Sequence, residues 1–133
     1  MEIILVVGLP GSGKTHWVNE HKTEHDIFLD DIILINDLVE AVKKDPEHLF
    51  IVDPNLCYPK TLEYAKQLIF DLFAFPTREI FFQNDPEQCR KNVVLRNDGR
   101  NVENSIKMLS AKYNPPANAI PVWKPNEEKN TEE

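Results

Sequence analysis

The residues between Gly8 and Thr15 carry the spacing that most directly implies chemistry. Their sequence, GLPGSGKT, matches the pattern G-x-x-x-x-G-K-[ST] at every fixed position. Glycines let the backbone wrap a phosphate with its N–H groups inward, and a following helix adds the positive end of its dipole. We therefore expect a P-loop that binds ATP or another nucleoside triphosphate, with Thr15 as a ligand of Mg²⁺. The residues expected to hold the phosphates are Gly8, Gly11, Ser12, Gly13, Lys14 and Thr15.

Aspartates follow two apolar runs of strand length. Asp30 ends one of these runs and Asp31 comes next. Because phosphoryl transfer needs a carboxylate that accepts a proton, either residue could be a general base, while Asp31 could instead cap the following helix. Asp53 ends another run, where it could bind the metal as a Walker B aspartate or begin a turn at Pro54.

Positive charge gathers late in an otherwise acidic chain. Residues 86–113 hold six lysines and arginines against three acids, whereas the whole chain has a net charge of -7. The turn RNDGR at 96–100 joins two helical patterns, so a mobile lid there would carry Arg96 and Arg100 onto the nucleotide phosphates. Arginines in that position stabilise charge that develops in the transition state. The alternative is that these arginines lie on a solvated helix face and form ion pairs there.

The elements that must position these residues alternate along the chain. Strands are predicted at 3–7, 25–30, 49–53 and 79–83, and helices at 14–21, 31–44, 59–73, 86–97 and 102–113. This alternation predicts an α/β fold, a three-layer α/β/α arrangement of the P-loop NTPase type with a parallel sheet of about four strands and a helical lid. Ligands then bind at the carboxyl ends of the strands. We expect one domain at 1–123, its lid at about 86–113, and a disordered acidic tail at 124–133.

Composition excludes several classes of protein. The 133-residue chain has two cysteines without metal-site spacing and no apolar run of membrane-spanning length, so we expect a cytoplasmic protein without a membrane anchor. Its negative charge argues against a non-specific nucleic-acid coat. The segment PPANAIPVW at 115–123 is typical of an extended arm that either lies across the body or contacts a protein partner.

Taken together, these motifs resemble the P-loop kinases of the polynucleotide-kinase type, the kinase half of phage-type polynucleotide kinase/phosphatases. The matching segments are GLPGSGKT with Trp17, the paired aspartates at 30–31, DPNL at 53–56, RNDGR at 96–100 and IPVW at 120–123. The resemblance implies that Asp30 activates a 5′-hydroxyl acceptor, that Arg100 is the lid arginine, and that Asp53 belongs to the acceptor-side network. The residues that we place on the acceptor side are Asp31, Ile33 and Asn55.

The position of Ile33 departs from that family. The family has an arginine three residues after its catalytic aspartate, where it grips the acceptor's phosphate, and here an apolar side chain stands in its place. We therefore expect an ATP- and Mg²⁺-dependent kinase whose acceptor is a hydroxyl of a nucleic acid, a nucleotide or another small molecule. The alternative is an ATPase or switch module that acts through a protein partner.

Overall fold

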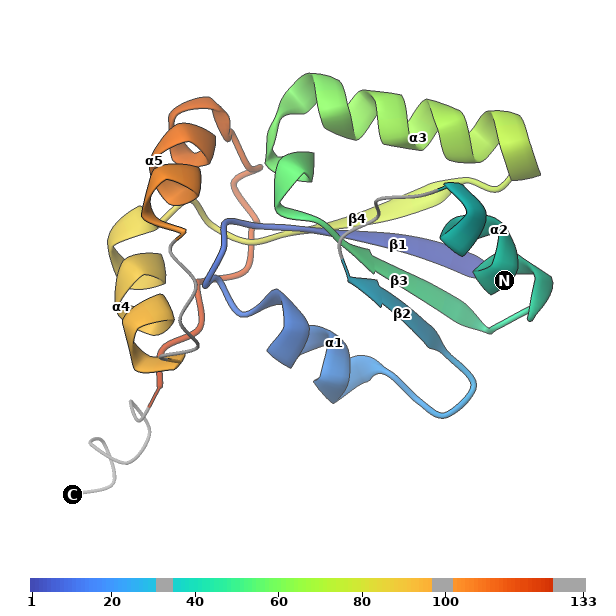
Figure 1. Cartoon of the computed structure of the whole chain (residues 1–133), viewed down its shortest axis with the longest axis horizontal. Helices are drawn as coiled ribbons and strands as arrows, with labels where there is room; N and C mark the ends of the chain where they lie inside the picture. The colour runs from blue at the N-terminus through green and yellow to red at the C-terminus, as the bar shows by residue number, and fades with distance from the viewer. Residues whose placement is uncertain (31–34, 97–101, 126–133) are drawn as a thin grey trace.

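The protein is an α/β domain built on one parallel sheet (Figure 1). A computed structural model describes residues 1–30, 35–96 and 102–125. In these ranges the strands are β1 (Glu2–Val7), β2 (Ile27–Asp30), β3 (His48–Val52) and β4 (Thr77–Phe81), in the order β2-β3-β1-β4. The helices are α1 (Lys14–His21), α2 (Ile35–Lys43), α3 (Pro59–Phe73), α4 (Pro86–Arg96) and α5 (Glu103–Lys112), with a 3₁₀ turn at Pro54–Cys57. The predicted α/β class and four-stranded parallel sheet are confirmed.

Some predicted features lie outside the described residues. These are Asp31 and Ile33 of the acceptor side, the lid arginine Arg100, and the tail from residue 126 onward. None of the helices within the described ranges is long and apolar enough to cross a bilayer.

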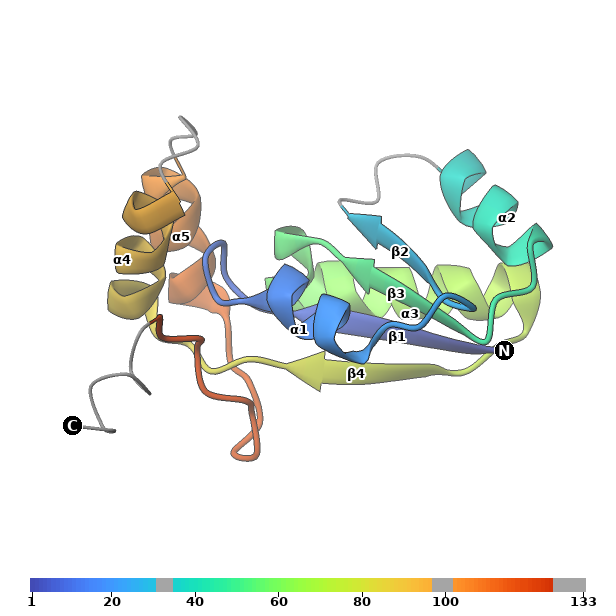
Figure 2. The same ribbon diagram turned by 90° about the horizontal axis from the view of Figure 1, so that it is seen from below.

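The central strand β1 is buried on both faces because its side chains alternate between two cores. Ile3, Leu5 and Val7 join one apolar cluster, in which Ile69 of α3 packs. Side chains on the other face of β1 join a second cluster, in which Val18 of α1 packs. Helices therefore cover both faces of the sheet, α3 on one side and α1 on the other (Figure 2), an arrangement compatible with three α/β/α layers.

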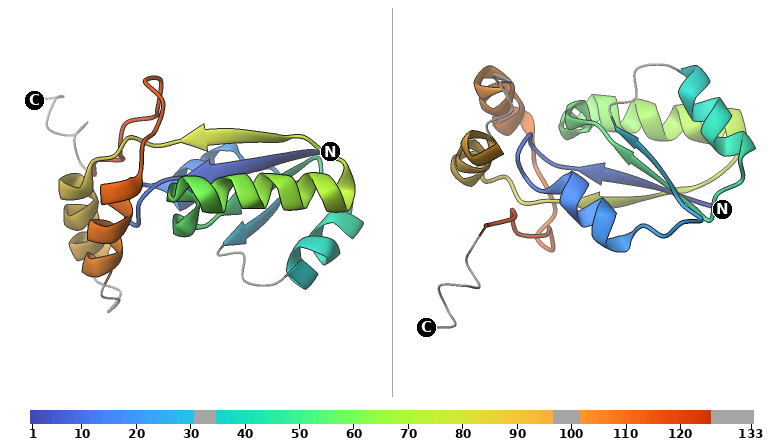
Figure 3. Two further views of the ribbon diagram at one scale, coloured as in Figure 1. Left: turned by 90° about the horizontal axis from the view of Figure 1, so that it is seen from above. Right: turned by 60° about the horizontal axis from the view of Figure 1, so that its bottom comes forward.

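The strand order places a crevice at the carboxyl ends of β1 and β3. These neighbouring strands are followed by helices on opposite faces, α1 after β1 and α3 after β3, which is the topological switch point where α/β sheets bind ligands. The hairpin of α4 and α5 stands beyond this end of the sheet, away from the N-terminus (Figure 3). Residues from the loop after β1, the ends of β2 and β3, and the helical hairpin can therefore meet at one place.

The segment after α5 runs back across the body as an extended arm. Ile120 pairs with the chain just beyond β4, donating its N–H to the carbonyl of Phe81 at 2.8 Å and accepting from Gln83 at 2.8 Å. At the start of the arm, the hydroxyl of Tyr113 donates to the carbonyl of Phe82. The fourth strand spans Thr77–Phe81, two residues earlier at each end than the predicted 79–83, and Phe82 beyond it forms a bridge with the arm.

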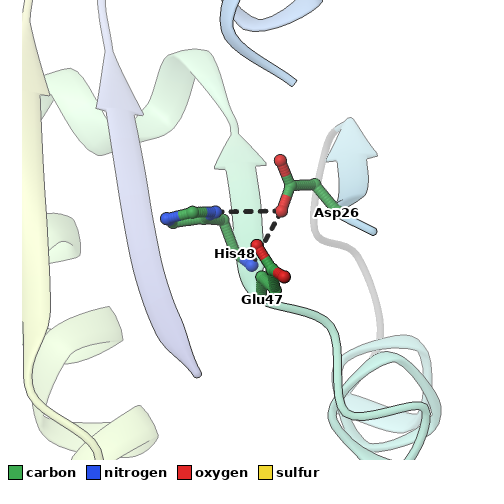
Figure 4. A group of neighbouring side chains, drawn as sticks. All are labelled: Asp26, Glu47 and His48. Atoms are coloured by element: carbon green, nitrogen blue, oxygen red, sulfur yellow. Dashed lines mark hydrogen bonds and ion pairs between the residues drawn. The ribbon is translucent and has the colours of Figure 1, made fainter. Parts of the chain in front are cut away.

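The second strand begins at Ile27, two residues later than predicted, because Asp26 holds a turn. One carboxylate oxygen accepts from the N–H and the hydroxyl of Thr23, and the other accepts from the backbone N–H and Nδ1 of His48, each at 2.9 Å (Figure 4). Burial by itself would raise the pKa of Asp26, but these hydrogen bonds hold the pKa below its ordinary value. Glu47 lies beside this pair, and the group stands at the amino ends of the strands, away from the crevice.

Replacement of Asp26 by Asn tests this turn. Since the folded-state pKa is below the unfolded value of 3.8, the ionised carboxylate stabilises the fold above that pH, and the contribution is lost as pH falls through the folded pKa. Asp26→Asn should lower the free energy of unfolding by about 1–3 kcal/mol at neutral pH and by less at pH ~3, measured by urea denaturation. Glu24→Gln, at an exposed carboxylate, is the control. An equal loss at both pH values would contradict the assignment.

Candidate functional site

A cavity of about 460 Å³ opens at the carboxyl ends of the strands. The loop after β1, the end of β2, the turn after β3, helices α4 and α5, and the C-terminal arm all contribute to its wall. The cavity brings together most of the described residues that the sequence singles out, which are Gly11, Gly13, Lys14, Thr15, Asp30, Asn55 and Arg96. The remaining described candidates, Gly8, Ser12 and Asp53, lie next to these residues without lining the cavity.

Lys14 holds the first carbonyl groups of the loop. Its ammonium donates to the carbonyl oxygens of Gly8 at 2.7 Å and Leu9 at 2.8 Å, and the residue is only 7% exposed. The carbonyl of Gly13 accepts the first backbone bond of α1, from Trp17 at 2.9 Å. These three carbonyl oxygens are thus bonded within the loop and the helix that it starts.

Two further loop carbonyls are held by segments about a hundred residues downstream. Asn92 of α4, buried with 4% exposure, donates its amide to the carbonyl of Gly11 at 2.9 Å and to that of Trp123 at 2.7 Å. The amide oxygen of Asn92 accepts from Gln88 at 3.0 Å. The N–H of Trp123 donates to the carbonyl of Ser12 at 3.1 Å. Helix α4 and the arm therefore bind the carbonyl side of the loop.

The backbone conformation at Gly11 and Gly13 excludes other residues. Their φ angles are 86° and 100°, in the left-handed region that side chains disfavour. A Cβ at Gly11 would lie 2.5 Å from the carbonyl oxygen of Cys89, and one at Gly13 would lie 2.6 Å from the Cβ of Trp123. The N–H of Ser12, between these two glycines, donates to the carbonyl of Leu9 at 3.0 Å and closes the turn of the loop.

The side chain of Ser12 points into the protein. The residue is fully buried, and its Oγ has no hydrogen-bond partner within the described part of the chain. Its Oγ would be 2.5 Å from a Cβ at Gly8, so the two residues are packed together beneath the loop. Gly8 and Ser12 therefore shape the loop through their backbone and close packing.

The acidic and basic candidates reach the cavity from separate elements. Asp30 is the last residue of β2 and Arg96 the last of α4, and both are exposed to solvent at the cavity wall. Asp53 caps the 3₁₀ turn, since its Oδ1 accepts from the N–H of Asn55 at 2.9 Å. Asp53 thus has the turn-forming role that was one of its two predicted alternatives, and its role as a metal ligand stays a prediction.

Two thiols lie beneath the loop. Cys57 and Cys89 are buried and not joined to each other. Burial raises the pKa of each thiol to about 12, so neither is poised as a thiolate nucleophile at neutral pH. They act as small apolar side chains of the core.

Sequence reasoning missed several residues of the cavity. His16, Asn92 and Ser105 line it but belong to no motif, and Trp123 lines it as well. An amide such as Asn92 in the middle of a helix gives no signal, because its partners are 81 and 31 residues away. The IPVW segment gave a signal for Trp123 as an anchor of the arm, but not as part of the cavity wall.

Replacement of Asn92 by Ala should destabilise the protein. The change leaves the carbonyl groups of Gly11 and Trp123 without their side-chain donor, which should lower the free energy of unfolding by about 1–3 kcal/mol in urea denaturation. Gln88→Ala removes only the donor to the side-chain oxygen of Asn92, so it should lower the free energy of unfolding by less than half as much. Equal losses in the two variants would show that the contact between α4 and the loop contributes nothing of its own.

Comparison with known proteins identifies one clear relative. No protein-family model matches the chain. The uncharacterized protein R277 of Acanthamoeba polyphaga mimivirus is 36% identical over 104 residues, which cover 74% of this chain and 75% of that protein. An identity this high over three quarters of both chains indicates common descent, and the chain therefore belongs to the same family as the mimivirus protein R277.

Proposed function

We propose that this protein is a phosphotransferase of the P-loop kinase type, dependent on ATP and Mg²⁺. It transfers the γ-phosphoryl group to a hydroxyl of a nucleic acid, a nucleotide or another small molecule. The observation that carries the proposal is the single cavity in which Lys14 and Thr15 meet Asp30 and Arg96, supplied by three separate elements. Phosphoryl transfer requires this combination of phosphate-binding loop, carboxylate and cation.

The loop fits the phosphates of a nucleotide. Its carbonyl groups have donors in Lys14, Asn92 and Trp123, and left-handed conformations such as those of Gly11 and Gly13 favour a backbone whose N–H groups bind an anion. Helix α1 begins at Lys14, so its dipole adds positive potential at the same place. Thr15 is exposed at the cavity wall and offers a hydroxyl to Mg²⁺, which neutralises charge on the phosphates when it is bound.

Asp30 is suited to receive the proton of the acceptor. As the acceptor oxygen bonds to the γ-phosphorus, the bond from that phosphorus to the bridging oxygen breaks and ADP leaves. The hydroxyl proton passes to the carboxylate of Asp30, which stands at the edge of the cavity on β2. Arg96, at the end of α4, supplies a cation for the charge that develops on the phosphates. The lid role of Arg100 remains a prediction from the resemblance.

The wall around Asp30 defines the acceptor side. Asn55 and Ser105 offer uncharged polar groups, and Val52, Val102 and Leu109 add apolar surface. Such a mixture suits a hydroxyl compound with an apolar face, such as a sugar carrying a base. The resemblance to kinases of the polynucleotide type supports testing nucleosides, nucleotides and oligonucleotides first.

A transfer assay tests the proposed function. The full chain is mixed with Mg²⁺ and ATP labelled at the γ-phosphate, and offered 5′-hydroxyl oligonucleotides, nucleosides, nucleoside monophosphates or no acceptor. We expect label in an organic acceptor, and a loss of at least about 100-fold in its rate for Asp30→Asn. Lys14→Ala should lose as much, because the loop loses its ammonium.

Controls separate chemistry from folding. Lys43→Ala, at the end of α2, and Asp71→Asn, near the end of α3, change an exposed lysine and an exposed aspartate at the other end of the sheet (Figure 1), and should transfer at the wild-type rate. Urea denaturation of Asp30→Asn, measured alongside the transfer assay, separates a loss of transfer from a loss of folding. Release of free phosphate without any labelled acceptor, or full activity of Asp30→Asn, would contradict the proposal.

A further inference from the structure

We propose that the indole ring of Trp123 is the stacking surface for the base of the bound nucleotide, with His16 beside it. The inference rests on the proposed function and names the part of the site that recognises the nucleoside. Trp123 lines the same cavity as Gly13, Lys14 and Thr15, at the end of an arm that joins the fold from the opposite end of the chain. The arm passes near the loop before α1 (Figure 3).

Two backbone hydrogen bonds and one packing contact hold Trp123 at the loop. Its N–H donates to the carbonyl of Ser12 at 3.1 Å, and its carbonyl accepts from Asn92 at 2.7 Å. Its Cβ packs so closely on Gly13 that a Cβ there would lie 2.6 Å away. The backbone that carries the ring is thereby held against the loop, which reduces the conformational entropy lost when a ligand stacks on the ring.

Trp123 is partly exposed, whereas its neighbour in the arm is buried. Val122 is 4% exposed and points into the core, whereas Trp123 is 41% exposed at the cavity wall. Its ring is tilted at 42° to that of His16, with the centroids 5.3 Å apart, so the two rings are not stacked face to face. A large exposed aromatic ring at a cavity wall is a feature typical of ligand sites.

Trp17 shows what a packing tryptophan looks like in the same protein. Its ring stacks on His21 at 4.0 Å and 23°, meets the ring of Phe50 edge-on at 6.1 Å, and packs against the core on the α1 face of the sheet. It is absent from the residues that line the cavity. The two tryptophans therefore differ in role, and Trp17 supplies a matched control.

The chemistry of the cavity wall selects the ligand. The loop and the first turn of α1 offer backbone N–H groups and the positive end of a helix dipole, which favour phosphates, and Trp123 beside Gly13 offers an aromatic ring. A molecule that carries phosphates at one end and a planar π-system at the other is a nucleotide. Stacking on an aromatic ring is tolerant of base identity, so Trp123 should contribute similarly to the binding of ATP and GTP.

Comparison of ATP with inorganic tripolyphosphate, which lacks the nucleoside, tests the proposal. Calorimetry on the full chain with Mg²⁺ should show that Trp123→Ala weakens ATP binding by about 10- to 100-fold and changes tripolyphosphate binding by less than about 2-fold. The alanine keeps the backbone bonds and the Cβ that packs on Gly13, so the loop is left in place. Trp123→Phe should retain most of the ATP affinity, and Trp17→Phe should leave the ratio of the two affinities unchanged.

The outcomes distinguish this proposal from the one on which it rests. If Trp123→Ala weakens the binding of ATP and of tripolyphosphate equally, the residue only supports the loop. If it leaves the binding of ATP unchanged, stacking is excluded. Wild-type protein that binds neither ligand would overturn the proposed function itself. A direct readout comes from Trp17→Phe, which leaves Trp123 as the sole tryptophan. ATP should quench its fluorescence and tripolyphosphate should not, whereas equal quenching would contradict stacking.

Discussion

The loop between Gly8 and Thr15 turns through left-handed backbone at Gly11 and Gly13, and its carbonyl groups find donors in separate parts of the chain. Lys14 supplies the donor for the first two carbonyls, and α1 supplies one for Gly13. The carbonyl of Gly11 accepts from the amide of Asn92, and the carbonyl of Ser12 accepts from the N–H of Trp123. A short loop near the N-terminus thus depends on helix α4 and the C-terminal arm for its shape, because a buried carbonyl without a donor is costly.

This dependence explains why the arm crosses the body. The bridge between Phe82 and Ile120 holds the arm beside the end of β4, and so does the hydrogen bond from the hydroxyl of Tyr113. From there the arm continues to the loop. The same path delivers a tryptophan to the cavity wall. One segment therefore stabilises the loop through its backbone and adds an aromatic ring to the cavity through its side chain.

Local patterns were sufficient to predict much of the architecture. The apolar run of β1 predicted a strand covered on both faces, and the motif from Gly8 to Thr15 predicted the loop and the start of α1. Strand ends predicted that Asp30 would reach the same edge as the loop, which the cavity bears out. These features depend on neighbours in sequence or on the general rule that parallel strands end at one edge.

Features that depend on long-range partners were not predictable. The amide of Asn92 has no local signature, and its importance arises only when α4 docks on the loop. Asp26 is predicted in a strand, whereas its carboxylate accepts hydrogen bonds from Thr23 of the preceding turn and from His48, a partner 22 residues away that no local pattern indicates. Side-chain hydrogen bonds of this kind compete with strand formation, and the turn prevails here.

Amide resonances of the glycines test the central claim most directly. Three of the chain's four glycines lie in the loop, so a ¹⁵N-labelled sample gives a simple set of glycine signals. If the backbone of the loop is a phosphate cradle, adding Mg²⁺ with ATP or tripolyphosphate should shift the amide signals of Gly11 and Gly13 in a saturable way. Amide signals of Gly11 and Gly13 that stay unmoved at millimolar concentrations of both ligands would contradict the account.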